Sequence, residues 1–345
     1  MKYLVTGGCG FIGFNFSELL LKRGDNVTIL DNLSRKGTTA NLIYLQENYP
    51  KVKFVHADIR NDYHKFIPLM EKVDVVFHLA GQVAVTSSFK VPREDFEINA
   101  LGTFNILEAI RQSKRKPTII YASSNKVYGG MTDVKVIEEN NRYKYKDLPK
   151  GIAEDRLLDF HSPYGCSKGV SDQYVRDYSR MYPGVKTVVM RQSCIYGKNQ
   201  FGIEDQGWVA WFAIAAYFGK PITIFGDGKQ VRDVLYVDDL FDAWDKAAND
   251  IDNVNGEIFN VGGGNKYSLS LLELLEFLED KLDKRVKHTF SDWRPGDQPV
   301  FISDISKAKR VLKWKPTTSN TKGIGNLLAW IKENESIVKG QLKVS

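Results

Sequence analysis

The sequence contains few residues that cross-link a chain or bind metal ions. Its three cysteines, Cys9, Cys166 and Cys194, are too scattered for a disulfide framework or a paired metal-binding spacing. Its five histidines form no His-x-x-x-His pair, so we expect no metal site. A reducing compartment, the cytoplasm, is therefore the expected location. The first apolar segment begins at residue 2, so we also expect no signal peptide.

Long apolar runs and a strong excess of one charge are also missing. The longest apolar run, Trp208 to Phe218, has eleven residues and is too short to span a bilayer. Forty-eight Lys and Arg against forty-two Asp and Glu give a net charge of +6, which leans only weakly toward anionic ligands. We expect neither a membrane nor a nucleic-acid partner. The 345 residues, 43% of them hydrophobic, suffice for one large or two medium domains with a buried core.

Short apolar runs alternate with helical segments in the first 190 residues. The runs of strand type are 2–6, 26–31, 52–56, 73–79, 118–122 and 186–190. Amphipathic segments lie between several of them, among them Phe11 to Lys22, Pro92 to Gln112 and Tyr164 to Met181. Strands with nearly continuous Val, Ile and Leu are typical of a parallel sheet covered on both faces. Right-handed crossovers then predict an α/β protein with a doubly wound parallel Rossmann sheet.

The alternation ends after about residue 192. Stretches rich in glycine and aromatic residues follow, and then amphipathic segments at Ser270 to Leu282 and Ile324 to Glu333. We predict a smaller, discontinuous α+β lobe for the substrate, formed by residues 193–232 and 263–345. Residues 1–192 and 233–262 would form the cofactor-binding domain, with Val234 to Val261 returning to the main sheet.

A glycine-rich turn lies between the first strand and the first helix. Residues 7–13, Gly-Gly-Cys-Gly-Phe-Ile-Gly, fit both G-x-G-x-x-G and G-x-x-G-x-x-G. The missing side chains allow a pyrophosphate to approach backbone amides at a helix N-terminus. Such a turn can be purely structural, but Asp31 closes the second strand eighteen residues after Gly13.

A carboxylate at the end of the second strand has a defined use. It hydrogen-bonds the ribose hydroxyls of a dinucleotide and repels a 2′-phosphate, which favours NAD over NADP. Arg35 and Lys36 lie nearby in the sequence and could soften that exclusion. An exposed acid at a strand end is the alternative interpretation of Asp31.

Tyr164 and Lys168 lie four residues apart, on one face of a predicted helix. A lysine charge and a positive nicotinamide ring would lower the phenol pKa from about 10, making a base near neutral pH. Such a pair also arises by chance, as a packed tyrosine beside a surface lysine. The strand Thr118 to Ala122, however, runs into Ser123 and Ser124, at a sheet edge where ligands bind. A serine there can hold the substrate oxygen whose proton the tyrosine takes.

Together these residues resemble a known family. The resemblance is to extended short-chain dehydrogenases/reductases acting on nucleotide sugars, and it rests on Gly7 to Gly13, Asp31, Asp58-Ile59-Arg60, His78-Leu79-Ala80-Gly81, Asn99, Ser124, Tyr164 and Lys168. Residues 232–240 and 294–298 resemble the diphosphate and ribose contacts of that family. Within it, the strings at 31–37, 78–83, 124–129, 159–169 and 205–209 are similar to epimerases of CDP-linked dideoxyhexoses. The resemblance covers essentially the whole chain.

The resemblance implies three sets of site residues. The catalytic set is Ser124, Tyr164 and Lys168. The NAD-binding set is Gly7, Gly10, Phe11, Ile12, Gly13, Asp31, Asn32, Ser34, Arg35, Asp58, Ile59, Leu79, Ala80, Gly81, Gln82, Asn99, Ser123, Tyr164 and Lys168. The set for the nucleotide-diphosphate sugar is Gln82, Ser124, Asn125, Gln192, Arg232, Arg294 and Asp297. The two arginines would pair with the diphosphate, for which a planar, forked cation is suited, and surface ion pairs are the alternative.

Two positions argue against one activity of the family. Its sugar 4,6-dehydratases carry an Asp-Glu pair after the active-site Ser or Thr, where this sequence has Asn125 and Lys126. Neither residue can serve as a carboxylate acid or base, so dehydration is disfavoured. Asn125 could hydrogen-bond sugar hydroxyls, whereas Lys126 could equally face solvent.

The resemblance implies an NAD-dependent epimerase that oxidises a sugar carbon transiently and returns the hydride to the opposite face. It implies C2 of a CDP-linked 3,6-dideoxyhexose as the inverted centre. A UDP- or GDP-hexose epimerase acting at C4 or C2 remains open, as does a scaffold that senses NAD without catalysis. The segments Pro92 to Gln112 and Tyr164 to Met181 resemble the helices through which this family dimerises. A homodimer or homotetramer is therefore implied, although the same apolar stripes could be ordinary core.

Overall fold

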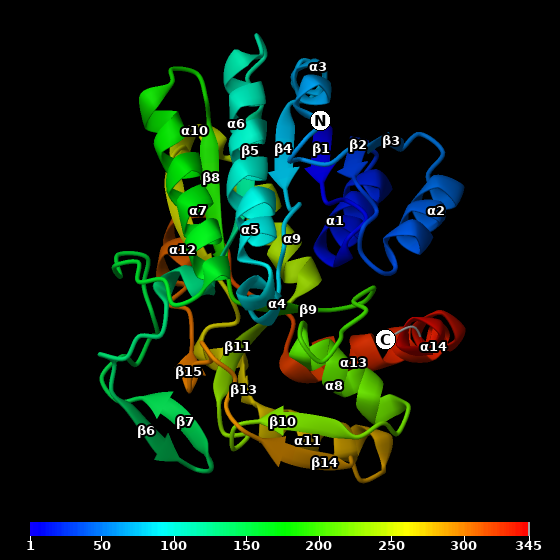
Figure 1. Ribbon diagram of the computed structural model, residues 1–345, viewed down its shortest axis with the longest axis vertical. Coiled ribbons are helices and arrows are strands. Elements are labelled where there is room, and N and C mark those ends of the chain that lie inside the picture. The colour runs from blue at the N-terminus through cyan, green and yellow to red at the C-terminus, as the bar shows by residue number, and fades with distance from the viewer. Residues whose placement is uncertain (344–345) are drawn as a thin grey trace. The chain divides into compact units, whose positions relative to one another are not determined.

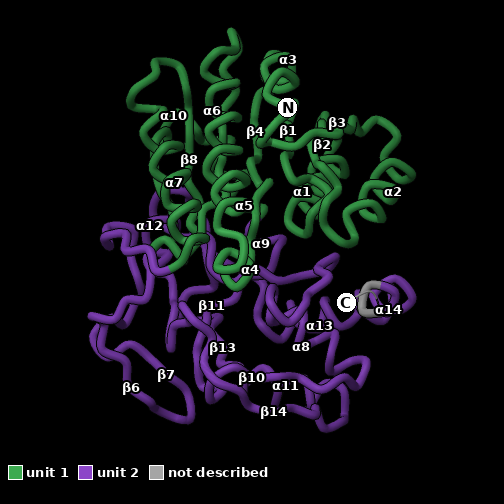
Figure 2. The backbone as a smooth tube through the Cα atoms, viewed as in Figure 1, with its two compact units in different colours: residues 1–127, 162–191, 241–259 green, residues 128–161, 192–240, 260–345 purple. Residues whose placement is uncertain are grey.

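The computed structural model describes residues 1–343, which form two compact units (Figures 1 and 2). Unit 1 contains residues 1–127, 162–191 and 241–259. Unit 2 contains residues 128–161, 192–240 and those from 260 onward. The chain therefore passes between the units several times, as expected for a discontinuous second lobe.

The main sheet has seven strands in the order β12-β8-β5-β4-β1-β2-β3. Their bounds are β1 Lys2–Thr6, β2 Asn26–Asp31, β3 Lys53–His56, β4 Val75–His78, β5 Thr118–Ser124, β8 Thr187–Gln192 and β12 Glu257–Val261. The pairs β1–β2, β1–β4, β2–β3 and β4–β5 are parallel. The predicted doubly wound Rossmann sheet is therefore confirmed. Its order reverses between β1 and β4, and ligands of such sheets bind at this switch point.

Helices cover both faces of this sheet because side chains alternate along its strands. On one face, the Tyr3 and Phe77 rings lie 5.3 Å apart, and Trp244 of α9 meets Phe77 edge-on at 5.3 Å. On the other face, Leu4 belongs to a buried cluster with Ile106 of α6.

The helical elements that begin in or belong to unit 1 are α1 Phe11–Lys22, α2 Thr38–Asn48, η1 Tyr63–Lys65, α3 Phe66–Met70, α4 Val85–Lys90, α5 Pro92–Phe96, η2 Glu97–Leu101, α6 Gly102–Gln112, η3 Asn125–Tyr128, α7 Pro163–Met181 and α10 Ile251–Val254, together with α9 Val237–Asn249, which starts in unit 2.

The predicted helix at Pro92 to Gln112 contains one irregular turn. The segment η2, Glu97–Leu101, is a π-helix between α5 and α6. A π-turn adds a residue to a helical turn and occurs frequently at functional sites. Pro92 occupies the first turn of α5, where the missing N–H leaves no helical hydrogen bond unmade.

Unit 2 mixes short strands and helices, as predicted for an α+β lobe. Its elements are β6 Val136–Glu139, β7 Arg142–Tyr145, β9 Cys194–Tyr196, α8 Trp208–Tyr217, β10 Ile222–Phe225, β11 Val231–Tyr236, η4 Asn265–Tyr267, β13 Ser268–Ser270, α11 Leu271–Leu282, β14 His288–Ser291, β15 Val300–Phe301, α12 Ser306–Val311, α13 Asn320–Glu333 and α14 Glu335–Lys343. The helix α11 begins with a capping box, in which Ser270 and Glu273 each accept the other's backbone N–H. Across residues 1–343, no helix is long and apolar enough to cross a membrane.

Two segments lie elsewhere than the sequence predicts. Residues 128–161, expected in the cofactor domain, belong to unit 2 because Tyr145 donates to the Val300 carbonyl and Ile152 bridges to Ser303. The segment Val234 to Val261 does not return to the main sheet as a whole. The strand β11 pairs with β9, β13 and β15, and only β12 joins the seven-stranded sheet. An apolar run predicts a strand but does not specify its partner strand.

Candidate functional site

The turn between β1 and α1 is closed by glycines that serve different purposes. Gly7 has a φ of +66°, and a Cβ there would lie 2.8 Å from the backbone of Ala80. A Cβ on Gly13 would lie 2.1 Å from the Gly7 carbonyl oxygen. Gly10, by contrast, has an ordinary φ of −73° and ψ of 175°, and its Cβ would meet only the Gly7 oxygen, at 3.3 Å. The fold alone has little need of glycine at position 10, which fits a backbone that a pyrophosphate approaches closely.

Asp31 lies at the end of β2 and is held by the glycine turn. Its carboxylate accepts the Cys9 amide at 3.0 Å and the Leu33 amide at 2.8 Å. Burial raises the pKa of Asp31, and the two amide hydrogen bonds oppose this change. A fixed acceptor beside the turn fits the ribose hydroxyls of NAD, as the sequence predicts.

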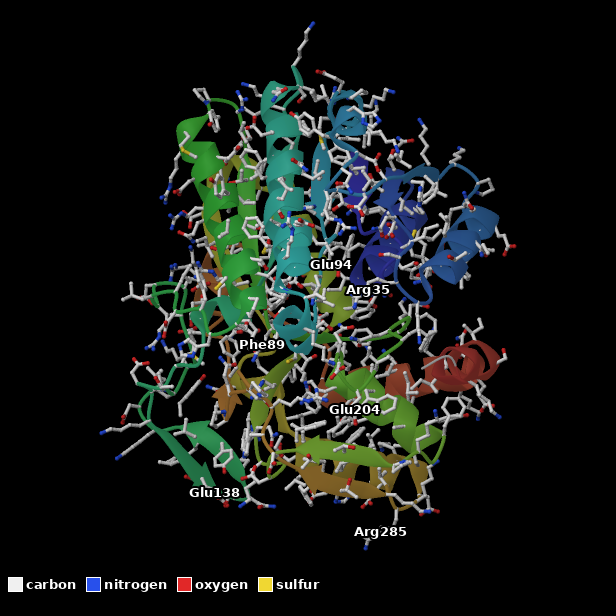
Figure 3. All side chains as sticks on the ribbon, in the orientation of Figure 1. Arg35, Phe89, Glu94, Glu138, Glu204 and Arg285 are labelled. Carbon is white, nitrogen blue, oxygen red and sulfur yellow. The ribbon has the colours of Figure 1, made fainter. Side chains whose placement is uncertain are left out.

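The predicted adenine-side residues form one cluster beyond β2 and β3. Asn32 donates to the Asp58 carboxylate at 3.0 Å, and the Ser34 amide donates back to Asn32 at 3.1 Å. Arg60 donates to both Asp58 oxygens and lowers the pKa of Asp58 to about 2. Arg35 lies in the same loop after β2 and is labelled in Figure 3.

The end of β4 is fixed by a chain of hydroxyl and imidazole groups. Thr6 accepts the amides of Leu79 and Ala80, both at 3.2 Å, and contacts His78 Nδ1 at 2.7 Å. Because Thr103 donates its proton to the Asn99 carbonyl, it accepts from His78 Nε2 at 3.1 Å. His78 is fully buried, and burial lowers its pKa to about 3. The ring therefore remains neutral.

Asn99 extends this chain to the loop after β4. Its side-chain oxygen accepts the Gln82 amide at 2.9 Å, which positions a segment predicted to bind NAD. The side-chain amide of Gln82 is occupied by the backbone of Ala84, because it donates to the Ala84 carbonyl and accepts the Ala84 N–H. Its backbone is therefore better placed for a ligand than its amide group, which the resemblance assigns to the substrate.

The predicted catalytic residues come together in unit 1. Ser124 is the last residue of β5, whereas Tyr164 and Lys168 occupy successive turns of α7. The helix α7 begins where Ser162 accepts the Gly165 amide at 3.0 Å, with Pro163 as its first residue. The Ser124 side chain also interacts with the Tyr164 phenol, whose pKa it lowers.

The charge state of this group depends on burial. Burial raises the pKa of Tyr164 to about 12, while the Ser124 hydrogen bond lowers it and Asp95 raises it. Burial also lowers the pKa of Lys168 to about 7, although Asp95 and Asp172 raise it. The Lys168 ammonium lies 4.4 Å from the centroid of the Tyr121 ring. The phenol therefore needs a further positive charge to act as a base near neutral pH, and a nicotinamide ring carries one.

Two buried carboxylates beside Lys168 were not identified from the sequence. Asp172 binds Arg191 through two hydrogen bonds of 2.9 Å and accepts the Ser123 hydroxyl at 2.6 Å. The side chain of Ser123, predicted to bind the cofactor, is thus directed to Asp172. Asp95 accepts the Ser167 hydroxyl. The one feature of the sequence that points to Asp95 is its position four residues before Asn99, on the same helix face.

The remaining predicted substrate residues, apart from Asn125, belong to unit 2. Arg232, buried at β11, forms an ion pair with Asp297. Arg294 donates to the carbonyl of Glu204, which is labelled in Figure 3, and its guanidinium lies 3.7 Å from the centroid of Phe225. The Asp297 amide donates to the Arg294 carbonyl at 3.1 Å, so one tight turn carries both residues.

Two further predicted residues are buried. Gln192 ends β8, and Asn125 follows Ser124 with its side-chain oxygen 3.3 Å from that hydroxyl. The amide of Lys126 also donates to Ser124, at 3.2 Å. The Ser124 hydroxyl is therefore held by the first turn of η3.

Comparisons with known proteins show which family the chain is similar to. Residues 4–327 match the family described as GDP-mannose 4,6 dehydratase. The chain is 46% identical to CDP-paratose 2-epimerase from Salmonella typhi, over 96% of this chain and 99% of that protein. It is 32% identical to UDP-glucuronate 4-epimerase from Thermodesulfobacterium geofontis (strain OPF15), over 98% of each chain. The crystal structure of UDP-glucuronic acid 4-epimerase from Bacillus cereus with UDP-glucuronic acid and NAD is 30% identical, with a TM-score of 0.83, and the match covers 96% of this chain and 99% of that one.

The glycine turn, the switch-point site and these matches define a nucleotide-sugar enzyme built on a Rossmann sheet. The chain belongs to the GDP-mannose 4,6 dehydratase family, within the extended short-chain dehydrogenases/reductases. The prediction of an NAD-dependent epimerase, an isomerase, is confirmed by its relatives.

Proposed function

We propose that the protein inverts C2 of a CDP-linked 3,6-dideoxyhexose and converts CDP-paratose into CDP-tyvelose, a step of deoxysugar and polysaccharide biosynthesis. The observation that carries this proposal is the 46% identity to a CDP-paratose 2-epimerase along nearly the full length of both chains. We also propose that the protein acts in the cytoplasm, because NAD and the nucleotide sugar are expected to be cytoplasmic metabolites.

Three residues would carry the chemistry. Ser124 donates to the reacting sugar hydroxyl and orients it toward Tyr164, whose phenolate takes the proton. Lys168 stabilises the phenolate by its charge and holds the nicotinamide ribose. NAD, when bound, accepts the hydride from the sugar carbon and returns it. Tyr164 then gives its proton back to the new hydroxyl, so the reaction has no net oxidation.

Asn125 supports epimerisation over dehydration. Loss of water from a sugar requires an acid that protonates the leaving hydroxyl. Asn125 is buried beside Ser124, and an amide cannot donate a proton in this way. It can hydrogen-bond a sugar hydroxyl and so help to seat the ring.

Arg232 and Arg294 would bind the diphosphate. Both guanidinium groups are held in place, by Asp297 and by Phe225 respectively. A fixed guanidinium loses little freedom on binding, and it meets phosphate oxygens through two parallel hydrogen bonds.

Product analysis tests the substrate assignment. The purified protein would be incubated with CDP-, GDP- and UDP-hexoses, and the products would be identified by NMR. We expect inversion at C2 of the CDP-linked dideoxyhexose and no NADH release in stoichiometric amounts. Inversion at C4 of a UDP- or GDP-hexose would instead favour the second candidate, since a UDP-sugar 4-epimerase matches almost the whole chain. Stoichiometric NADH would identify a dehydrogenase.

We also propose that the protein dimerises through α6 and α7. Their exposed apolar side chains include Phe104 and Tyr174, whose rings meet edge-on at 5.8 Å, and Met181. Exposed apolar stripes on adjacent helices are typical of protein interfaces. Sedimentation should give a dimer or tetramer for the wild type and a smaller species for Tyr174→Glu. The control is Phe290→Glu, which alters a more exposed ring on β14 and should leave the assembly intact.

A further inference from the structure

Asp95 is a buried carboxylate in unit 1. It lies on α5, is 0% exposed, and directly follows Glu94, which is labelled in Figure 3. Its Oδ2 accepts the Ser167 hydroxyl, and its Oδ1 accepts the Asn99 side chain at 3.3 Å. Asn99 also donates to the Ser167 oxygen at 3.1 Å. The three side chains form a closed triangle, joining α5 and η2 to the turn of α7 that carries Lys168.

Asp95 differs from the other buried acid near Lys168. Asp172 is neutralised by Arg191 through a two-pronged ion pair. Burial raises the pKa of the Asp95 carboxyl, whereas the Ser167 hydroxyl, the Lys168 charge and the Asn99 amide group lower it. A buried charge is costly unless an opposite charge compensates it, so Asp95 and Lys168 depend on each other.

Several other groups face Lys168. His78 from β4 is neutral, and Tyr121 from β5 contributes a ring face. Tyr164 is neutral until it loses its proton, and Arg35 acts on Tyr164 from the loop after β2. Asp95 and Asp172 both raise the pKa of Lys168, but Asp172 is also paired with Arg191.

Lys168 also lies close to the triangle in space. A Cβ added to Gly81 would lie 2.9 Å from the Asn99 side-chain oxygen and 3.9 Å from Lys168 Nζ. Ser167 precedes Lys168 directly in α7. An interaction that fixes Ser167 therefore also fixes the backbone from which Lys168 extends.

We propose that Asp95 is a positioning residue that keeps Lys168 charged, and that Ser167 and Asn99 hold its carboxylate in place. The proposal rests on the Tyr164–Lys168 assignment of the proposed function, but not on the identity of the sugar. Asp95 need not touch the substrate, since it acts through Lys168.

The sign of the expected effect follows from electrostatics. A negative charge favours the protonated form of every neighbouring group. Asp95 accordingly raises the pKa of both Lys168 and Tyr164. Asp95→Asn removes the charge at constant size, so both groups should lose their protons at lower pH. A variant that displaces Lys168 or Tyr164 but keeps the Asp95 charge would not lower both pKa values together.

Cofactor binding alone can test this. When NAD⁺ binds, the positive nicotinamide ring should release protons from Tyr164 and Lys168. Calorimetry in two buffers of different ionisation enthalpy measures that release between pH 5.5 and 9.5. We expect the release profile of Asp95→Asn to move about one pH unit lower than the wild-type profile. With a substrate available, both limbs of the kcat/KM profile should move in the same direction.

Two control variants separate charge from structure. Asp95→Glu keeps the charge and should restore the wild-type profile. Ser167→Ala removes a hydrogen bond but not the charge, so it should weaken NAD binding with a smaller shift of the profile. An unshifted Asp95→Asn profile would overturn the proposal, as would an equal shift in Ser167→Ala.

A wild-type measurement covers the case in which Asp95→Asn does not fold. The ε-carbon NMR signal of Lys168, assigned as the signal missing from Lys168→Arg, should report an ammonium at pH 6. A neutral amine at that pH would contradict the role given to Asp95. Neither measurement uses a sugar, so a wrong substrate assignment would leave both results interpretable.

Discussion

The Ser124 side chain lowers the pKa of the Tyr164 phenol, although forty residues separate the two in the sequence. The end of β5 supplies one hydroxyl and the first turn of α7 supplies the other. A hydroxyl donor and a phenol therefore converge at the carboxyl end of a central strand.

Tyr164→Phe should abolish most turnover while leaving NAD binding nearly intact. The substitution removes the phenol oxygen but keeps the ring, and a positioned base contributes about 10²- to 10⁴-fold to a rate. Turnover would be followed by product NMR and NAD affinity by calorimetry. Tyr178→Phe is the matched control, since it removes a hydroxyl from the same helix that donates to Glu108. Wild-type turnover in Tyr164→Phe would refute the assignment of the base.

Gly10→Ala and Gly13→Ala should fail for different reasons. A methyl group at Gly13 would overlap the Gly7 carbonyl oxygen at 2.1 Å, so this variant should lower the melting temperature. A methyl group at Gly10 meets that oxygen at 3.3 Å and should be tolerated by the fold. Gly10→Ala should instead weaken NAD binding by at least about tenfold, because its methyl group occupies ligand space. Equal NAD affinity in Gly10→Ala and the wild type would argue against a pyrophosphate at this turn.

Arg232→Lys should raise KM for the nucleotide sugar by about 10- to 100-fold with a smaller effect on kcat. Lysine keeps the charge but loses the forked geometry that binds a diphosphate and Asp297 together. NAD affinity should be unchanged and serves as the internal control. Steady-state kinetics would separate the two constants, and a loss confined to kcat would point to a different role.

His78 should make the protein less stable in mild acid. Its pKa is about 3 when folded and about 6.5 when unfolded, so the unfolded chain binds more protons between these values. The free energy of unfolding therefore falls as the pH drops through this window, by up to about 1.4 kcal/mol per unit. Urea unfolding at pH 7 and pH 5 should show that His78→Gln loses about 2 kcal/mol less than the wild type over this interval. His288→Gln, at an exposed position, should follow the wild type.

The local structure around the predicted cofactor residues was predictable because its signals are local. The glycine turn, Asp31 and the Tyr164–Lys168 spacing lie within single strands, turns or helices, where periodicity indicates their geometry. The strands β1 to β5 follow from apolar runs for the same reason. The contact of Asp95 with Ser167 was not predictable, because the two residues are 72 positions apart and only the folded chain brings them together.

The second unit was harder to predict for another physical reason. The hairpin β6–β7 has alternating polar residues that fit either unit, and its assignment depends on contacts such as Tyr145 with Val300. The strand β11 is as fully buried as β4 and β8 of the main sheet, yet it pairs with β9, β13 and β15. Strand composition reports burial and not the identity of the neighbouring strand.

The π-turn at Glu97–Leu101 sets a phase relation within one continuous helical segment. The turn takes up one extra residue without ending the helical segment, so Asp95 before it and Asn99 within it both reach Ser167. Deleting one residue between them would shorten this stretch and should separate one of the two side chains from Ser167.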